Sequence, residues 1–146
     1  MEKQLVEPFE CVTTRLVKNE DLNHHGTLYA GRTAEWVVDS GFVAISSILN
    51  PKNIVCLKIH GLFFSQATRT GEVLRFTSRI AYTGKTSIVV QVEAHKNKSK
   101  GHALSAFVTF IHVDESTLPA PHFVTLNPIT KADKKLFEEA SELHKK

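Results

Sequence analysis

Between residues 27 and 49 the chain carries a helical pattern that is apolar on nearly every side. Its apolar positions are Ala34, Trp36, Val37, Val38, Phe42, Val43, Ala44, Ile45, Ile48 and Leu49. Asn50-Pro51 then ends the predicted helix, Thr27–Leu49. A helix of this kind is covered by other structure instead of lying on a surface. The remainder of the chain must therefore wrap around it.

The segments around this helix have strand patterns. We predict a first strand at Phe9–Val17 and four more at 53–64, 72–82, 86–95 and 103–113. Apolar and polar residues alternate along 72–82 and 86–95, and a short glycine turn joins these two strands. This combination is typical of an antiparallel meander.

A last amphipathic helix is predicted over 132–144, after Pro119 and Pro121 end the sheet region. Thr130 and Asp133 resemble a capping box at its start. The sequence therefore predicts an α+β protein, in which an antiparallel sheet of about five strands wraps one long central helix. We expect one domain over residues 1–127, with residues 128–146 packing on it or extending from it.

Composition argues against several classes of function. At 146 residues the chain is long enough for one compact domain and too short for two. A net charge of +3, with acidic and basic residues interleaved, does not indicate a nucleic-acid partner. The longest apolar run, Gly41 to Leu49, is too short for a membrane span, and Met1–Pro8 lacks an apolar signal core. Cys11 and Cys56 show no zinc-type spacing, so we expect buried free thiols, no metal site and a cytoplasmic location.

The segment before the predicted helix has the pattern of a binding site. Residues 21–31 read DLNHHGTLYAG, so small residues open the helix and its unpaired N–H groups can approach a ligand closely. Asn23 lies just upstream, and Asp39 lies about two turns inside the helix as the only charge between Trp36 and Leu49. This combination predicts a site that holds a carbonyl or phosphate group and delivers a polar group to it.

Several motifs in order resemble the hotdog-fold acyl-CoA thioesterases, most closely their acyl-CoA hydrolase branch. They are Asn23-x-x-Gly26 followed by Ala30-Gly31, Phe64 with Gly71-Glu72-Val73-Leu74, Gly84-Lys85-Thr86-Ser87 before 90–92, and Phe107-x-x-Phe110 with Val113-Asp114. The resemblance covers nearly the whole chain and implies a hotdog fold. It also implies hydrolysis of an acyl-CoA thioester to a free acid and coenzyme A, with no metal or redox cofactor.

The resemblance assigns roles around the helix start. Asn23 would orient or activate the attacking water, and the backbone N–H of Ala30 would polarise the thioester carbonyl. The helical carboxylate of the family falls at Val38, one residue before Asp39, which is a rotation of about 100°. Glu35, a turn earlier, is the other carboxylate considered. The family's site lies between two subunits, which implies a homodimer with its sheets edge to edge, assembling further into a tetramer or hexamer.

Binding of the rest of the substrate is less constrained by the sequence. The predicted contacts to acyl-CoA are Gly31, His25, Arg69, Lys85, Thr86 and Ser87, and the hairpin lysines Lys96, Lys98 and Lys100 are a further option for the phosphates. The acyl group stays open, because Trp36, Phe42, Phe63 and Phe64 either line its pocket or fill the core.

Two other functions remain possible at this stage. Asp21-x-Asn23-x-His25 partly resembles the signature of hotdog enoyl-CoA hydratases, in which Asp and His activate water for addition to a double bond. A protein that binds acyl-CoA without turnover is the second alternative.

Overall fold

The computed structural model describes residues 3–97 and 102–144. In that part of the chain the elements are β1 (Gln4–Val6), β2 (Glu10–Leu16), η1 (Asn19–Asp21), α1 (Ala30–Ser46), η2 (Pro51–Asn53), β3 (Ile54–Phe64), β4 (Val73–Thr83), β5 (Ser87–Lys96), β6 (His102–His112), β7 (Val124–Leu126) and α2 (Lys131–His144).

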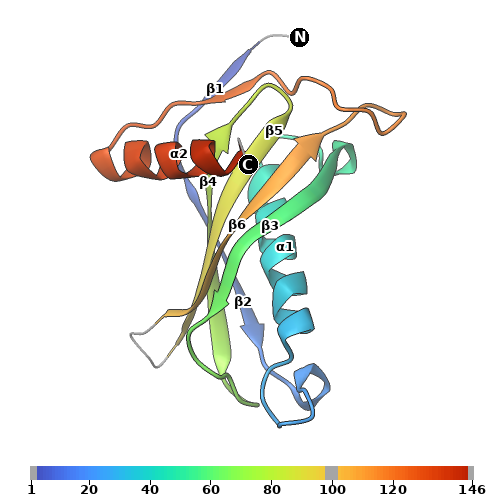
Figure 1. Ribbon diagram of the computed structural model, residues 1–146, viewed down its shortest axis with the longest axis vertical. Helices are drawn as coiled ribbons and strands as arrows, with labels where there is room; N and C mark the ends of the chain where they lie inside the picture. Colours follow the sequence, from blue (N-terminus) through green and yellow to red (C-terminus); the bar gives the residue numbers. More distant parts are fainter. Residues whose placement is uncertain (1–2, 98–101, 145–146) are drawn as a thin grey trace.

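The main sheet has five strands in the order β2-β4-β5-β6-β3, and every neighbouring pair is antiparallel. Helix α1 crosses one face of this sheet, and α2 lies on the opposite side (Figure 1). The α+β prediction is therefore confirmed, and so is the hotdog arrangement of a curved sheet around a central helix. The positions of the five predicted strands also agree with β2 to β6, within one or two residues.

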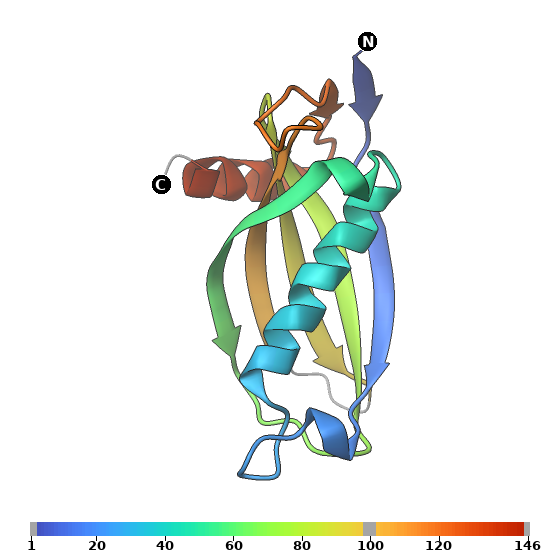
Figure 2. The ribbon, with the colours of Figure 1, turned by 90° about the vertical axis from the view of Figure 1, so that its right-hand side faces the viewer.

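Strand β3 curves around α1 at one edge of the sheet (Figure 2). Its pairing with β6 is shifted twice, between Cys56 and Lys58 and between His60 and Phe63. Gly61, with φ of 59°, lies in the second irregularity, where a left-handed backbone favours glycine. These bulges bend the strand so that the sheet can follow the helix.

The core forms between the sheet and one side of α1. Trp36 meets Phe76 edge to face with ring centroids 6.2 Å apart, and Phe42 meets Phe110 in the same way at 4.8 Å. Val37, Ala44 and Ile45 of the helix are also fully buried in this cluster. Aromatic and branched side chains of the two elements thus supply most of the apolar burial.

The prediction that α1 is covered on all sides is wrong. Gly31, Glu35, Asp39, Val43 and Ser46 are exposed, and their spacing of three to four residues places them on one side of the helix. The sheet covers only the other side (Figure 2).

The helix is also shorter than predicted, Ala30–Ser46 instead of Thr27–Leu49. At its start, Leu28 donates its N–H to Thr68 O and Tyr29 donates to Asp21 O, at 2.7 and 2.9 Å. These bonds to other segments hold residues 28 and 29 in extended conformations.

A second, two-stranded parallel sheet was not predicted. It pairs β1 with β7, whose three-residue lengths are too short for a periodic pattern. The buried His122 positions β7, because its Nδ1 accepts the N–H of Val124 at 2.9 Å and its Nε2 donates to Ser87 O at 3.0 Å. Burial is the main cause that lowers the pKa of His122.

Both cysteines are free thiols, as predicted, but the prediction that they are buried is wrong. Cys11 is half-buried in β2 and Cys56 is exposed in β3. These two strands are the edges of the sheet, so a side chain there has a neighbouring strand on one side only.

The predicted capping box at the start of α2 is confirmed. Asp133 N–H donates to Thr130 Oγ1 at 3.0 Å, and Thr130 N–H donates to Asp133 Oδ2 at 3.1 Å. Hydrogen bonds to its carboxylate from the backbone N–H and then the side chain of Thr130 lower the pKa of Asp133. The helix packs on the sheet through Leu136 and Ala140. Within the described residues, no helix has the length and apolar character needed to cross a membrane.

Candidate functional site

A tight turn around Asn23 precedes α1. Asn23 Oδ1 accepts the N–H groups of His25 and Thr27 at 2.8 and 3.2 Å, and Asn23 N–H donates to Thr27 O at 2.7 Å. Gly26 takes a φ of 78° within this turn. The side-chain oxygen of Asn23 is therefore used to hold the turn, whereas its Nδ2 donates to Thr27 Oγ1 at 3.2 Å and carries a second hydrogen.

A pocket of about 260 Å³ opens between this turn, the first turn of α1 and the segment 65–68. Its inner wall is apolar, from Leu74, Ala103 and Leu104, and its polar groups come from Asn23, Thr27, Thr33, Ser65, Gln66 and Thr68. The sequence-predicted Asn23 and Ala30 both line it. A pocket that combines apolar and polar walls suits a small group that carries a carbonyl.

The N-terminus of α1 faces this pocket through Ala30. Tyr29 is the N-cap residue and its side chain makes no capping hydrogen bond. The first turn contains no acidic residue that would offset the positive end of the helix dipole. Such a terminus favours an oxygen with partial or full negative charge.

Segment 65–68 forms one wall of the pocket and is held at three points. Ser65 N–H donates to Ala103 O at 3.0 Å, and Thr68 O accepts the N–H of Leu28 at 2.7 Å. Lys96 Nζ donates to Ala67 O at 2.6 Å. Sequence reasoning missed this wall, because nothing in a polar loop indicates which distant segment it will meet.

Lys96 also contacts the loop 69–72, which follows segment 65–68. Its Nζ lies 3.3 Å from Glu72 Oε2, and Glu72 Oε1 accepts the N–H of Arg69 at 2.7 Å. The hydrogen bond from Arg69, followed by that from Lys96, lowers the pKa of Glu72. Arg69 itself is exposed next to the pocket wall.

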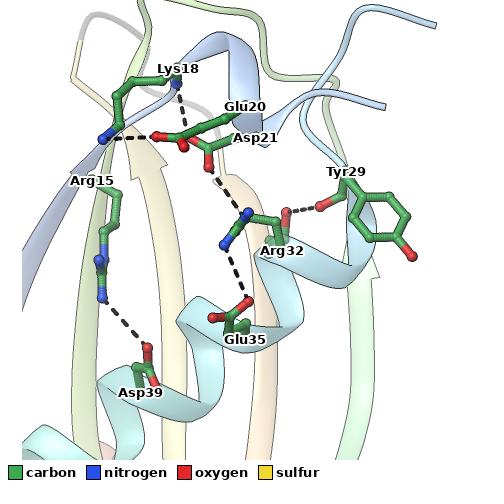
Figure 3. Close-up of polar contacts among 9 residues, drawn as sticks. Arg15, Lys18, Glu20, Asp21, Tyr29, Arg32, Glu35 and Asp39 are labelled. Atoms are coloured by element: carbon green, nitrogen blue, oxygen red, sulfur yellow. Dashed lines mark hydrogen bonds and ion pairs between the residues drawn. The ribbon is translucent and has the colours of Figure 1, made fainter. Parts of the chain in front are cut away.

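Neither helical carboxylate lines the pocket of its own chain, and Figure 3 shows each of them pointing toward an arginine side chain. Asp39 Oδ2 lies 3.6 Å from the guanidinium of Arg15, on the β2 side of α1, and Glu35 lies 3.6 Å from Arg32. Both carboxylates are more than half exposed. The structure thus brings Asn23 and Ala30 together and places neither Asp39 nor Glu35 beside them within one chain.

Asp21 and His25, the pair that the hydratase alternative needs, have different surroundings. Asp21 is buried, accepts the N–H of Lys18 at 2.9 Å, and lies 3.3 Å from Arg32 Nε (Figure 3). His25 is exposed, and its ring contacts that of His24 at a tilt of 42°, with ring centroids 4.0 Å apart. The carboxylate of Asp21 is therefore committed to the fold of the turn.

The remaining predicted contacts are spread over the molecule. Lys85, Thr86 and Ser87 follow the end of β4, whereas the pocket wall precedes its start, so the length of that strand separates them from the pocket. Ser87 is only 1% exposed. Gly31 lies under the Tyr29 ring. Lys98 and Lys100 lie outside the described residues. Among the described residues, no group of three His, Cys, Asp or Glu side chains is arranged to hold a metal ion.

A sequence model of the Thioesterase superfamily matches residues 25–101. A curated relative, the cytosolic acyl coenzyme A thioester hydrolase of Homo sapiens, is 28% identical over 133 residues. That match covers 85% of this chain and 34% of the relative, so the chain spans about a third of the curated relatives it matches.

Two solved structures have closely similar folds. A crystal structure of an apo-hexameric acyl-CoA thioesterase superposes with a TM-score of 0.82 at 27% identity, covering 93% of this chain and 88% of the other. An acyl-CoA hydrolase from Bacillus cereus superposes with a TM-score of 0.83 at 24% identity, covering 93% and 84%.

Proposed function

The chain belongs to the thioesterase superfamily, and on that basis we propose that it hydrolyses an acyl-CoA thioester to a free acid and coenzyme A. The observation that carries the proposal is the pocket at the N-terminus of α1, lined by Asn23 and Ala30. The names of the curated relative and of the solved structures, all acyl-CoA thioester hydrolases, support the choice of substrate.

In the proposed reaction the thioester carbonyl lies at the helix terminus. The N–H of Ala30 donates to the carbonyl oxygen, where negative charge develops as water attacks the carbonyl carbon. Asn23 Nδ2 donates its second hydrogen to the water or to that oxygen. The carbon–sulfur bond then breaks, and coenzyme A leaves with a proton from the water.

A carboxylate from a second subunit completes the proposed site. Asp39 and Glu35 lie on the exposed side of α1, where a neighbouring protomer can reach them. A carboxylate there could accept the proton of the attacking water. We keep Asp39 and Glu35 as equal alternatives, since each is paired with an arginine in the single chain.

The proposed homodimer uses the free edge of β3. Exposed apolar side chains gather on this strand: Val55, Leu57, Phe63 and Phe64. Apolar groups clustered at an open sheet edge are typical of a surface that pairs with another chain. The hexameric state in the name of one solved relative supports assembly beyond the dimer.

We propose that His25 and Arg69 contact the coenzyme A portion, because each is exposed in a segment that also lines the pocket. Lys85, Thr86 and Gly31 would contact acyl-CoA only at the pocket of another protomer. Ser87 would contact it only through its backbone. We further propose that water is the sole co-reactant, without a metal, and that the protein acts in the cytoplasm, as the name of the human relative supports.

A panel of acyl-CoA thioesters with free-thiol detection tests the function. We expect the wild type to release coenzyme A, and Asn23→Asp to lower kcat by about 100-fold, since one donor to the developing charge is lost. The Asp variant keeps the oxygen that holds the turn. Asn127→Ala, an exposed asparagine far from the pocket, is the control and should keep full activity.

The outcomes separate the alternatives. Release of no thiol by the wild type contradicts the enzyme assignment, and acyl-CoA binding without release favours a binding protein. Full activity in Asn23→Asp contradicts the proposed site. Loss of activity in Asp39→Asn but not in Glu35→Gln, or the reverse, identifies the carboxylate.

A further inference from the structure

The pocket at the start of α1 is closed at its inner end by the sheet. Leu74 of β4 and Ala103 and Leu104 of β6 form this floor, and each of them is at most 3% exposed. All three belong to the main apolar core and pack against its other side chains. A group that enters the pocket must therefore end at the floor.

Phe64 separates the floor from the surface. It lines the pocket, is 43% exposed, and pairs in register with Leu104, which places the two side chains next to each other. The other aromatic residues considered for the acyl group have different places. Trp36 and Phe42 fill the core, and Phe63 is 66% exposed at the edge of the sheet.

The mouth of the pocket is polar, whereas its interior can accept an apolar chain. Ser65 and Gln66 lie at the mouth and are exposed. Thr33 lies further in and is only 1% exposed, but its hydroxyl donates to Tyr29 O at 3.1 Å. Methylene groups can therefore cover Thr33 without leaving a buried donor unpaired. A chain that extends past the mouth meets polar groups and water instead, so apolar burial is gained inside the pocket.

The volume of the pocket limits how much of an acyl group is buried. A dry cavity of about 150 Å³ holds benzene, which corresponds to about 25 Å³ for each non-hydrogen atom. At that rate the 260 Å³ of this pocket holds about ten such atoms. The carbon, oxygen and sulfur of the thioester use part of this volume, which leaves room for about seven more carbons.

We propose that the pocket selects acyl groups of up to about eight carbons, and that Leu104 and Leu74 set this limit. The inference rests on the proposed function, which places the thioester carbonyl at Ala30. Because the floor is buried within one protomer, a second protomer could cover the mouth but could not deepen the pocket. A benzoyl group, whose ring takes the place of the chain, fits the same volume.

Saturated acyl-CoA thioesters from acetyl to dodecanoyl test the limit, with free-thiol detection. We expect kcat/KM to rise about three- to fourfold with each added methylene, because each one buries a similar apolar area. The rise should stop at about eight carbons, where the pocket is full.

Shortening the floor should move the limit. We expect Leu104→Ala to extend it by about three carbons, since that is what the substitution removes from the side chain. Leu74→Ala and the milder Leu104→Val should shift the limit in the same direction, and they carry the test if Leu104→Ala does not fold. Leu126→Ala is the matched control and should keep the wild-type limit. Leu126 is also buried, but its N–H bonds to Thr83 Oγ1 at the far end of β4.

Binding of S-alkyl-coenzyme A thioethers separates this inference from the proposed function, since these compounds carry the chain without a thioester to hydrolyse. Calorimetry with the butyl to dodecyl compounds should show the same limit. A Kd that keeps falling through dodecyl overturns the inference, and so does a wild type that binds none of the thioethers. A limit that the floor variants leave unchanged, or that Leu126→Ala moves as far, overturns it as well. A wild type that binds the thioethers with this limit but releases no thiol from the thioesters overturns the proposed function alone.

Discussion

Two glycines of α1 have different neighbours, although both lie in the same helix. A Cβ at Gly41 would lie 2.7 Å from Cζ of Phe110, whose ring is fully buried against Phe42. A Cβ at Gly31 would lie 2.5 Å from Cε2 of Tyr29, whose ring is 56% exposed. The first ring cannot move without disturbing the core, whereas the second can turn into solvent.

We expect Gly41→Ala to lower the free energy of unfolding by about 1 kcal/mol. Overpacking costs about 1–3 kcal/mol, and the better helix propensity of alanine offsets up to about 1 kcal/mol. Gly31→Ala is the matched control and should change stability by less than about 0.5 kcal/mol. Urea denaturation measures both, and equal effects would contradict this account of the two contacts.

At this scale the sequence predicted local groupings and missed distant ones. Asn23 and Ala30 were predicted to share a site because they are only seven positions apart, on either side of the predicted helix start. The Arg15 partner of Asp39 could not be predicted, since it depends on which face of α1 meets β2. The contact of Lys96 with Ala67 likewise depends on how two loops meet at one end of the sheet.

Among the elements, segment 65–68 controls the shape of the pocket. Two of its three attachments use backbone groups, so substitution leaves them in place. The third is the side chain of Lys96, which also pairs with Glu72. Lys96 is therefore a positioning residue for the pocket wall, and it lines no part of the pocket itself.

We expect Lys96→Met to raise KM about three- to tenfold with little change in kcat, because loss of a charge-assisted hydrogen bond loosens the wall. Lys96→Arg should keep KM close to the wild-type value. Hydrogen exchange of the amides of residues 65–68 should be faster in the Met variant. Lys52→Met, which removes an exposed lysine elsewhere, should have no such effect, and unchanged exchange in Lys96→Met would refute the role.

The main elements were predictable because their patterns are long. Strands of ten or eleven residues show clear alternation, and a sheet formed by these strands is the simplest cover for the apolar pattern of α1. Strands β1 and β7 were missed because three residues carry no period. The exposed side of α1 was missed for a different reason. An apolar helix pattern does not show whether its side chains are buried by the same chain or by a second chain.

For the whole molecule, the two edges of the sheet differ in chemistry. β3 exposes Leu57 and Phe63 by 65% and 66%, whereas β2 exposes Val12 and Leu16 by 47% and 52% and carries Glu10 and Arg15 in ion pairs. We expect Leu57→Glu to convert the proposed dimer to monomers, since a charge would be buried in the contact. Loss of hydrolysis should accompany dissociation if the carboxylate comes from the partner.

Val12→Glu is the matched control for this change. Val12 is 47% exposed on the opposite edge, so the same substitution there should leave mass and activity unchanged. Sedimentation at several protein concentrations measures both variants. A Leu57→Glu protein with wild-type mass would exclude the β3 edge as the dimer contact.

The unlike edges have one more consequence. A sheet whose two edge strands can both pair with another chain can add copies without limit and grow into a fibre. Glu10 and Arg15 place charged side chains on β2, which disfavours a further strand at that edge, so we expect strand addition to stop once the proposed β3 contact is made. In that arrangement the fold would limit its own polymerisation and keep one edge for pairing.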